Sequence, residues 1–270
     1  MKLRRVGLYA SVGLLSVILL YPLYILFLVA FEPPRYTLDS LFPRQLPGGF
    51  TLTNLLTALG SFDLIDPLVK SLEVALLVAA LALALGIPAA YGLSRLPPVL
   101  SYGITTTLFV VNMMPAITIA VPISAEFISL GLYDSVPGLA LLQELVVLPL
   151  ATFILVGAFQ AIPREIEWQA RVDGAGLLRT VYRTLVPLAR SGIVAAFLLS
   201  WMFSWDEFTF AVILSPLKPT LPVVIYQNLT RGNLLATTAF AIVMTVPVIV
   251  VTVLLQRHLK GEELAGGLRG

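Results

Sequence analysis

The sequence predicts an all-α membrane protein with six transmembrane helices, from its composition, its apolar runs and its basic residues. Of its 270 residues, 58% are hydrophobic and only 12% are charged, and the mean hydropathy is +0.95. Soluble domains usually carry about 25% charged residues and about 45–50% apolar ones, so one soluble core could not bury this chain. The net charge of +2 is too small to suggest a nucleic-acid-binding protein. The absence of cysteine and the single histidine, His258, exclude a disulfide framework and a multi-histidine metal site.

A spanning helix needs about 20 predominantly apolar residues, and six stretches of the chain meet that requirement. The first follows the basic start MKLRR. It is longer than the ~7–15 residues of a signal-peptide apolar region, and no small-x-small cleavage site follows it. We therefore interpret it as a retained signal-anchor helix. The predicted spans are 6–31, 67–93, 103–124, 137–161, 191–214 and 234–256.

The basic residues predict the orientation of these spans. With the N-terminus inside, twelve Lys and Arg residues fall on the inner side and five on the outer side. Because basic residues near span ends favour the cytoplasm, this excess predicts a multi-pass membrane protein with both termini cytoplasmic. The five outer residues are Arg35, Arg44, Lys70, Lys218 and Arg231.

The predicted organisation is a single membrane domain with short extensions. Residues 1–66 hold the signal-anchor helix and an extracytoplasmic segment, in which a short helix is expected after Thr51. Residues 67–256 form the core of five spans, including a cytoplasmic loop at 162–190. Residues 257–270 form a cytoplasmic tail.

The loop IPREIEWQARVDGAGLLRTVYRTLVPLAR at 162–190 carries five arginines and three acids in a chain otherwise nearly free of charge. Pro163 suits the first turn of a helix, and Glu165 and Glu167 complement the dipole of that helix. The pair Asp173-Gly174 is typical of a helix stop. A second short helix is expected from about 175 to 185, before Pro187 ends the loop.

Two interpretations of this loop are open. Positive-inside charge with anionic lipid contact accounts for Arg179, Arg183 and Arg190. It leaves the acidic residues and the Asp-Gly joint unexplained. A shaped docking element for a soluble partner fits the loop as a whole better.

The loop resembles the EAA loop of ABC-importer permeases, whose pattern is E-A-A, three residues, G, nine residues, I-x-L-P. Ala170, Gly174 and Pro187 stand in register, whereas Trp168 replaces the Glu. The longer carbohydrate-permease form, with IP before the helix and a DGA joint, matches better at 162–163 and 173–175.

The resemblance extends over nearly the whole chain. It includes KSLEVALL…AAYGLSRL at 70–96, SLGLYDSVPGL at 129–139, FSWDEFTFAVIL at 203–214 and the tail QRHLKGEELAGGLRG, which is similar to that of maltose-type permeases. The fifth-span motif has Asp206 where the family usually has Asn. Four such segments in the right order identify the chain as similar to the smaller maltose/trehalose-type permease.

The resemblance implies the type I ABC-importer (MetI-like) permease fold and a division of labour between subunits. In that family the loop is a coupling helix that sits in a cleft of a cytoplasmic ATPase. The implied partners are a second homologous permease, two ATPase subunits that bind ATP and Mg²⁺, and an extracytoplasmic sugar-binding protein. The chain itself has no P-loop, because its only lysine followed by Ser or Thr is Lys70, which Val69 precedes. We therefore expect no enzyme activity, cofactor or metal in this chain, and no nucleic-acid partner.

The replacement of the motif Glu leaves the coupling contact open. In the family that carboxylate pairs with a basic group of the ATPase, and here Glu167 or Glu165 could take its role. Alternatively, Trp168 docks by apolar burial with a hydrated indole N–H. In maltose-type relatives the tail reaches between the ATPases, which makes Gly266, Gly267 and Gly270 candidates for contact here, although terminal glycines ordinarily fray.

Polar residues inside spans are candidates for the transport pathway, because a charge near the bilayer centre is costly without a partner or water. Trp205 and Asp206 offer an aromatic face for the C–H surface of a sugar and a carboxylate for its hydroxyls. Structural roles are equally open for Asp206, and are favoured for Glu144. The candidates are Asn112, Glu144, Trp205 and Asp206, with Gln143 and Glu207 beside them and Glu73 and Gln160 more peripheral.

Three rival functions remain. The same fold could import another solute such as glycerol phosphate, but only Lys70 places a cation within reach of the membrane. An intramembrane enzyme would need a nucleophile–base pair or metal ligands, and the spans contain no His or Cys. A secondary transporter would usually show more spans and internal repeats. We expect an ATP-driven sugar importer subunit.

Overall fold

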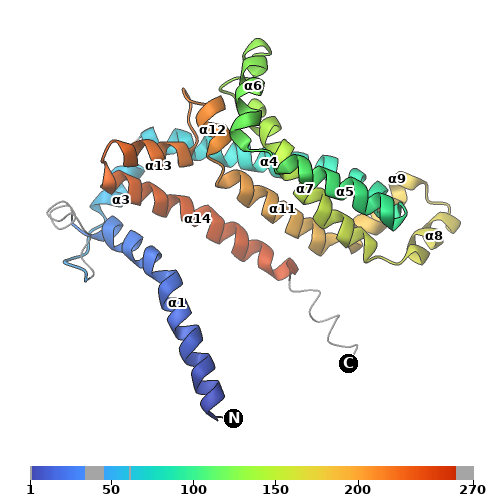
Figure 1. Ribbon diagram of the computed structural model, residues 1–270, viewed down its shortest axis with the longest axis horizontal. Helices are drawn as coiled ribbons and strands as arrows, with labels where there is room; N and C mark the ends of the chain where they lie inside the picture. Colours follow the sequence, from blue (N-terminus) through green and yellow to red (C-terminus); the bar gives the residue numbers. More distant parts are fainter. Residues whose placement is uncertain (1, 34–45, 61, 260–270) are drawn as a thin grey trace. The chain divides into compact units, whose positions relative to one another are not determined.

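The structure is a computed structural model that describes residues 2–33, 46–60 and 62–259 (Figure 1). All regular elements in these ranges are helical. They are α1 (Lys2–Phe31), α3 (Thr53–Leu59), α4 (Phe62–Arg95), α5 (Pro98–Asn112), α6 (Ala116–Ser129), α7 (Val136–Gln160), α8 (Arg164–Val172), α9 (Leu177–Thr180), η1 (Val181–Leu185), α10 (Val186–Leu188), α11 (Arg190–Trp205), α12 (Thr209–Leu214), α13 (Leu221–Thr230) and α14 (Leu234–Leu259).

The chain forms two compact units. One comprises Met1–Asp66 and Val224–Val246, and the other Pro67–Val223 and Pro247–Gly270. In the first unit, α3 packs against the end of α1: Asn54 Nδ2 donates to the carbonyls of Ala30 at 3.3 Å and Glu32 at 3.0 Å. The short helix expected after Thr51 is therefore present, and buried hydrogen bonds fix it to the first span.

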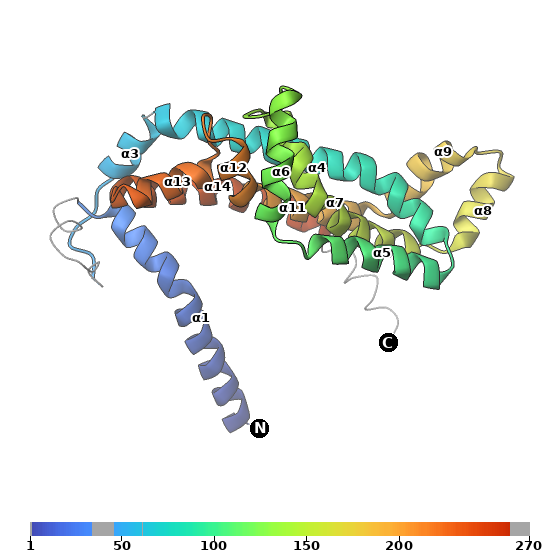
Figure 2. The same cartoon turned by 45° about the horizontal axis from the view of Figure 1, so that its top comes forward.

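The second unit is built around α7. Figures 1 and 2 show α5 and α11 running alongside α7, with α6 and α12 beyond one end of these helices and α8 and α9 beyond the other. A Cβ added to Gly192 of α11 would lie 2.3 Å from the Cβ of Ala158, so the absent side chain permits the close approach of α11 to α7. On α4, a Cβ at Gly86 would lie 3.1 Å from Leu155. Small residues thus let long apolar helices pack tightly, as in other membrane bundles.

Four helices are long and apolar enough to cross a membrane: Tyr9–Phe31, Leu64–Arg95, Val136–Gln160 and Leu234–Gln256. A fifth is added if Leu177–Leu188 and Arg190–Trp205, which meet at 80°, count as one span. The helical membrane fold is as predicted, but two of the six predicted spans are not single helices. The predicted third span divides into α5 and α6, and the predicted fifth into α11 and α12.

Local chemistry accounts for both interruptions. Pro115 has no N–H to donate and disfavours helical geometry at the residue before it, so α5 ends and α6 starts afresh. In the second interruption the Glu207 carboxylate accepts the backbone N–H groups of Phe210 at 2.7 Å and Ala211 at 3.1 Å. A side chain that satisfies the first N–H groups of a helix starts that helix there, so α12 begins anew at Thr209.

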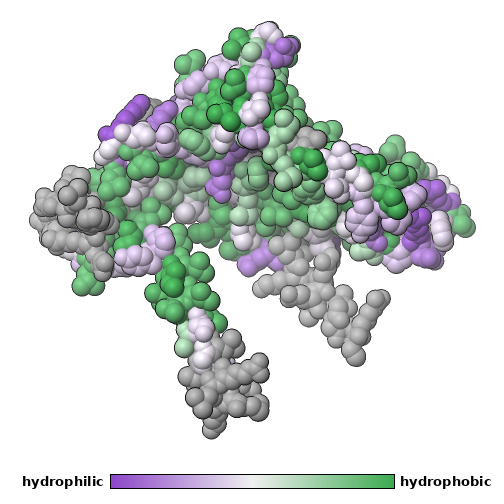
Figure 3. Space-filling model, viewed as in Figure 1, coloured by the Kyte–Doolittle hydropathy of each residue, from purple (hydrophilic) through white to green (hydrophobic). Residues whose placement is uncertain are grey.

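The surface of the second unit changes character along its length. Hydrophilic side chains gather over α8 and α9, whereas hydrophobic side chains cover much of the visible face of the remaining helices (Figure 3). Many large apolar side chains of the second unit are exposed, including Val99, Val110 and Leu145. This is the surface expected of helices that face lipid.

Candidate functional site

A pocket opens in the second unit at the two helix interruptions. Its volume is about 580 Å³, within the ~300–1,000 Å³ typical of small-molecule sites. The pocket brings together two predicted pathway residues, Asn112 and Asp206, that are far apart in the sequence. The lining residues are Asn112, Met114, Ala116, Val146, Leu150, Leu199, Met202, Phe203, Asp206, Glu207, Phe208, Thr209 and Phe210.

Asn112, the last residue of α5, is held by α7. Its Nδ2 donates to the carbonyl of Val146 at 2.9 Å, while its buried Oδ1 accepts no hydrogen bond from the described residues. A buried polar atom left unpaired costs ~1–3 kcal/mol. A water or a ligand hydroxyl in the pocket would satisfy this oxygen.

The two carboxylates of the pocket differ in their environment. Glu207 is fixed by the backbone N–H groups at the start of α12 and by Gln143 Nε2 at 3.4 Å, and Ser204 donates to the amide oxygen of Gln143. Asp206 caps the C-terminal end of α11, and its exposed carboxylate has no partner among the described residues. Glu207 therefore shapes the pocket, whereas Asp206 is available to a ligand.

Trp205 and Glu144 lie outside the pocket lining. The Trp205 side chain is buried and stacks on Trp201, with ring centroids 5.2 Å apart. The predicted Trp205–Asp206 pair is thus not a joint ligand surface, because consecutive residues on a helical turn point in different directions. Glu144 is buried in α7, and neither carboxylate oxygen has a partner among the described residues.

Most of the apolar residues that line the pocket were not predicted from the sequence. The rings near Asp206 belong to Phe203, Phe208 and Phe210 rather than to Trp205. A signal for them was present, since the acidic pair 206–207 within an apolar run and Pro115 in the predicted third span both mark helix interruptions. Two predicted peripheral residues, Glu73 and Gln160, are exposed and do not line the pocket.

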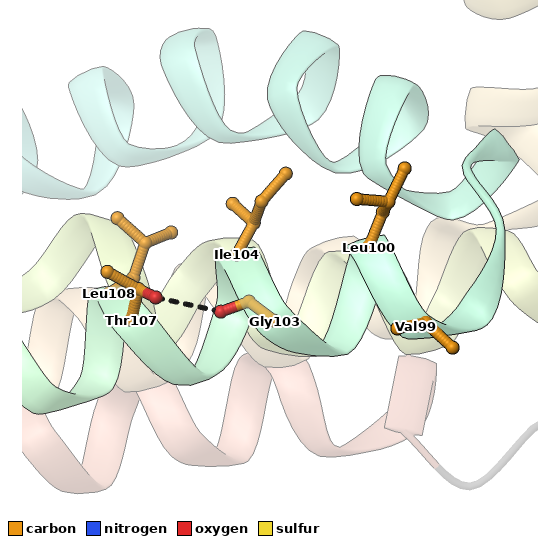
Figure 4. Close-up of a pocket in the computed structure, with 6 residues that line it drawn as sticks. All are labelled: Val99, Leu100, Gly103, Ile104, Thr107 and Leu108. Atoms are coloured by element: carbon orange, nitrogen blue, oxygen red, sulfur yellow. Dashed lines mark hydrogen bonds between the residues drawn. The ribbon is translucent and has the colours of Figure 1, made fainter.

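A second hollow lies on α5 and is a poorer candidate. Its volume is about 320 Å³, and it is lined only by residues of one helix. Leu100, Ile104 and Leu108 project from the same side of α5, while the Thr107 hydroxyl donates back to the Gly103 carbonyl at 2.9 Å (Figure 4). Because its one hydroxyl donates to the backbone, this surface offers a ligand no free side-chain hydrogen-bond donor.

The predicted docking loop contains an anchored helix. Glu167 of α8 is only 5% exposed, and it accepts hydrogen bonds from Tyr91 Oη at 2.7 Å, Arg95 Nε at 2.8 Å and Arg171 Nη2 at 2.6 Å. Arg95 also donates to the carbonyl of Phe159 at 3.3 Å. The C-terminal ends of α4 and α7 therefore hold α8 through one buried carboxylate.

These contacts set the protonation of Glu167. Burial alone would raise the pKa of its carboxyl group. The hydrogen bonds from Tyr91 and Arg95 and the positive charges of Arg95 and Arg171 outweigh burial and hold the pKa below its ordinary value of 4.5. Glu167 is thus an anion within the protein and is not free to pair with another subunit.

The joint after α8 has the geometry that the sequence predicted. Gly174 has φ +82°, its N–H bonds to the Arg171 carbonyl, and the Ala175 N–H bonds to the Ala170 carbonyl, each at 3.0 Å. This is a Schellman motif, in which a glycine with positive φ closes the helix. Asp173 is the C-cap residue of α8.

The second helix of the loop is longer than predicted. It runs from α9 through the π-helical turn η1 into α10, so Pro187 lies within the helical stretch and does not end it. Pro187 cannot donate to the carbonyl four residues earlier, and a widened π turn directly before it accommodates this loss. The chain turns by 80° only after Leu188, where α11 starts.

Large apolar side chains of the loop are exposed among its charged residues. Trp168 is 58% exposed, Val172 86% and Leu178 73%, and Leu177 is exposed beside them. We call these four residues the apolar knob. Glu165 is also exposed on α8, so its carboxylate is available for an ion pair. The Glu167 carboxylate is already bonded within the chain.

At the opposite end of the unit, Lys70 is also occupied. Its ammonium donates to the Ser215 hydroxyl and to the Lys218 carbonyl, and it lies 3.7 Å from the Asp134 carboxylate. Ser215 in turn donates to Asp134 at 2.7 Å. Lys70 therefore ties the start of α4 to two loops and does not reach the pocket lining.

The predicted contacts of the tail with the ATPases lie outside the described residues. The tail glycines Gly266, Gly267 and Gly270 fall outside the described part of the chain. Within residues 2–33, 46–60 and 62–259, no group of three or more His, Asp or Glu residues is placed to hold a metal ion.

The chain is similar in sequence to known permease proteins. The chain is 31% identical to the inner membrane ABC transporter permease protein YcjP of Escherichia coli (strain K12), over 99% of this chain and 98% of that protein. It is 29% identical to the trehalose transport system permease protein SugB of Mycobacterium tuberculosis (strain CDC 1551 / Oshkosh), over 93% of each.

The fold is also similar to that of a solved structure. A bacterial ABC transporter involved in the import of the acidic polysaccharide alginate contains a chain that matches with a TM-score of 0.76. The match covers 95% of this chain and 96% of that one at 19% identity, which shows a shared fold.

The profile of one family matches most of the core. It is described as the binding-protein-dependent transport system inner membrane component family, and it matches residues 82–261, which include both the pocket and the loop at 162–190. Members of this kind are transport components of the inner membrane rather than enzymes. On this match, and on its likeness to other permeases over nearly its full length, the chain belongs to the binding-protein-dependent transport system inner membrane component family.

Proposed function

We propose that this chain is the transmembrane subunit of an ATP-driven sugar importer that forms half of the translocation pathway. Family membership supports a permease role, and a relative whose name describes trehalose transport supports a sugar as the cargo. The observation that carries the proposal is the presence, in one packed unit, of a ligand-sized pocket and an anchored helix with an exposed apolar surface.

In this proposal the pocket at the helix interruptions is part of the sugar pathway. Interrupted helices bring backbone and polar groups to the middle of a membrane where they line a cavity. The carboxylate of Asp206 and the free Oδ1 of Asn112 accept hydrogen bonds from sugar hydroxyls. The rings of Phe203 and Phe208 offer faces for the apolar C–H surface of a sugar.

The loop at 162–190 couples ATPase closure to alternating access. The apolar knob inserts into a cleft of the ATPase, with Trp168 as the central contact. The Glu167 network then transmits the displacement of α8 to α4 and, through the bond from Arg95 to the Phe159 carbonyl, to α7, because a buried carboxylate held by three hydrogen bonds resists shear better than a flexible tether. Glu165 stands where it can pair with a basic group of the ATPase.

The proposed assembly contains a second, homologous permease, two ATPase subunits with bound ATP and Mg²⁺, and an extracytoplasmic sugar-binding protein. Both termini lie in the cytoplasm, as the distribution of Lys and Arg predicts. In this arrangement the loop at 162–190 and the tail with Gly266, Gly267 and Gly270 face the ATPases.

The proposal is tested by purifying the tagged chain, expressed with its neighbouring genes, in mild detergent. Native mass spectrometry should find one copy of this chain, one second permease and two ATPases. In proteoliposomes, sugar-loaded binding protein should then stimulate ATP hydrolysis and sugar uptake together. Recovery of the chain alone or as a homodimer without an ATPase would contradict the proposal.

A further inference from the structure

Membership of the family does not specify the charge of the pocket, but the residues that line it do. Its thirteen lining residues include the carboxylates of Asp206 and Glu207 and contain no Lys, Arg or His. The Glu207 charge is compensated by the N–H groups of Phe210 and Ala211. Asp206 is exposed to the pocket, and its carboxylate forms no hydrogen bond or ion pair in the described part of the chain. The pocket therefore carries one uncompensated negative charge.

Backbone dipoles do not reverse this sign. Helix ends carry partial charges of about half a unit, positive at the N-terminus and negative at the C-terminus. The first interruption brings the C-terminus of α5 and the N-terminus of α6 to the pocket, and their partial charges oppose each other. At the second interruption, the Glu207 carboxylate already bonds to the N-terminus of α12. Asp206 lies at the C-terminus of α11, where the partial charge of the helix is also negative.

The cation that lies in a predicted span, Lys70, is also held by other groups. Lys70 was the only cation that the sequence placed within reach of the membrane. Asp134, Ser215 and the Lys218 carbonyl hold its ammonium away from the pocket lining. An anionic cargo group would therefore meet a carboxylate without a compensating cation.

We infer that the pocket excludes anionic cargo and admits neutral or amino-bearing sugars, with Asp206 as the residue that sets this selection. The inference rests on the proposed sugar pathway. Two like charges about 5 Å apart at an effective dielectric constant of about 20 disfavour binding on the order of 100-fold. A neutral sugar instead donates hydroxyl hydrogen bonds to the Asp206 carboxylate, and an ammonium group adds an ionic attraction.

The electrostatic sign of the pocket can be measured without any cargo, because the chain contains no cysteine. A single Met114→Cys substitution places a thiol in the pocket lining of the complete complex. Its rate of reaction is measured with a trimethylammonium-ethyl and a sulfonatoethyl methanethiosulfonate, each normalised to the rate with a free thiol in solution. Labelling of this chain is followed by mass spectrometry, so thiols of other subunits do not interfere.

With Asp206 present, the cationic reagent should react at least ~10-fold faster than the anionic one. Asp206→Asn should bring the ratio close to one, and Asp206→Glu, which keeps the charge, should preserve it. Leu130→Cys, exposed and outside the pocket lining, is the matched control whose ratio should not depend on residue 206. A ratio at or below one at position 114, or a ratio that Asp206→Asn leaves unchanged, overturns the inference.

Uptake of a labelled neutral disaccharide by the same complexes separates this inference from the proposed function. If the labelling ratio follows residue 206 but no complex imports any sugar, the sugar-importer proposal fails and the charge assignment stands. If the disaccharide is imported while the ratio ignores residue 206, the importer stands and the charge assignment fails.

Discussion

Arg95 Nε and Glu167 Oε2 lie 2.8 Å apart and join the C-terminal end of α4 to α8. The two residues are separated by more than seventy positions in the sequence, and both side chains are largely buried. The guanidinium group also lies over the ring of Tyr91 at 5.4 Å, and that tyrosine donates to the other oxygen of Glu167. The contact fixes α8 to the helix bundle, so α8 is not a loosely attached loop.

The first prediction concerns this contact. Arg95→Met should weaken the attachment of α8 by ~3 kcal/mol, because it leaves a buried carboxylate with less compensation. Amide hydrogen exchange in Arg164–Val172 should then accelerate on the order of 100-fold. Arg164→Met is the control, since Arg164 is exposed and donates only a long 3.4 Å bond to the Arg95 carbonyl. Equal exchange in both variants would show that the ion pair does not hold α8.

The second prediction concerns pH. Because the pKa of Glu167 in the folded protein lies below its ordinary value of 4.5, the contact stabilises α8 fully above pH 4.5. The stabilisation should be lost as pH falls through the lower, folded pKa. Exchange of the α8 amides, corrected for the intrinsic rate, should therefore be constant from neutral pH to about 4.5 and rise in more acid solution. With Glu167→Gln this rise should disappear, and its persistence would assign the transition to another group.

The third prediction concerns the joint after α8. Gly174 has φ +82°, and a Cβ at this position would meet no atom within 4 Å, so only backbone strain opposes a side chain there. Gly174→Leu should cost ~1–2 kcal/mol, whereas Gly174→Asn should be milder because Asn tolerates this conformation. We expect Gly174→Leu to lower the amount of sugar imported per ATP hydrolysed by ~10-fold in proteoliposomes. Normal coupling in Gly174→Leu would remove the joint from the coupling mechanism.

The fourth prediction concerns the apolar knob. Trp168→Ala should weaken binding of the ATPase by about 2 kcal/mol, or ~30-fold, because exposed aromatic anchors dominate such interfaces. Trp168→Phe should retain most of the affinity. Gln169→Ala, a change on the same helix that leaves the knob intact, should have little effect. Binding is measured by titrating purified ATPase onto permease in nanodiscs. Equal affinity of the Trp168→Ala and Gln169→Ala proteins would leave Glu165 as the main contact.

The fifth prediction tests the packing of α11 on α7. A Cβ at Gly192 would lie 2.3 Å from the Cβ of Ala158, a rigid neighbour, whereas a Cβ at Gly157 would meet no atom within 4 Å. Gly192→Ala should therefore destabilise the protein by ~1–3 kcal/mol and lower its thermal midpoint. Gly157→Ala should be neutral or slightly stabilising, since alanine favours a helix. A matching loss of stability in both variants would show that the close helix approach is not the cause.

Much of this protein follows from its sequence alone. Apolar runs of spanning length predicted the helical membrane fold, since a backbone in lipid must satisfy its hydrogen bonds within a helix. The Asp173-Gly174 pair predicted the helix stop because glycine takes a positive φ at little cost. Those features depend on neighbours in the chain, and local patterns are sufficient to reveal them.

Only the tertiary structure decided which polar residues act together. Sequence made Glu165 and Glu167 equal candidates for an ion pair with a partner, but packing against Tyr91 and Arg95 buries Glu167 and leaves Glu165 exposed. Likewise, Trp205 and Asp206 are neighbours in the sequence, yet Trp205 stacks on Trp201 while Asp206 lines the pocket with Asn112. The physical reason is that burial and hydrogen-bond partners come from helices distant in the sequence, and no local pattern specifies them.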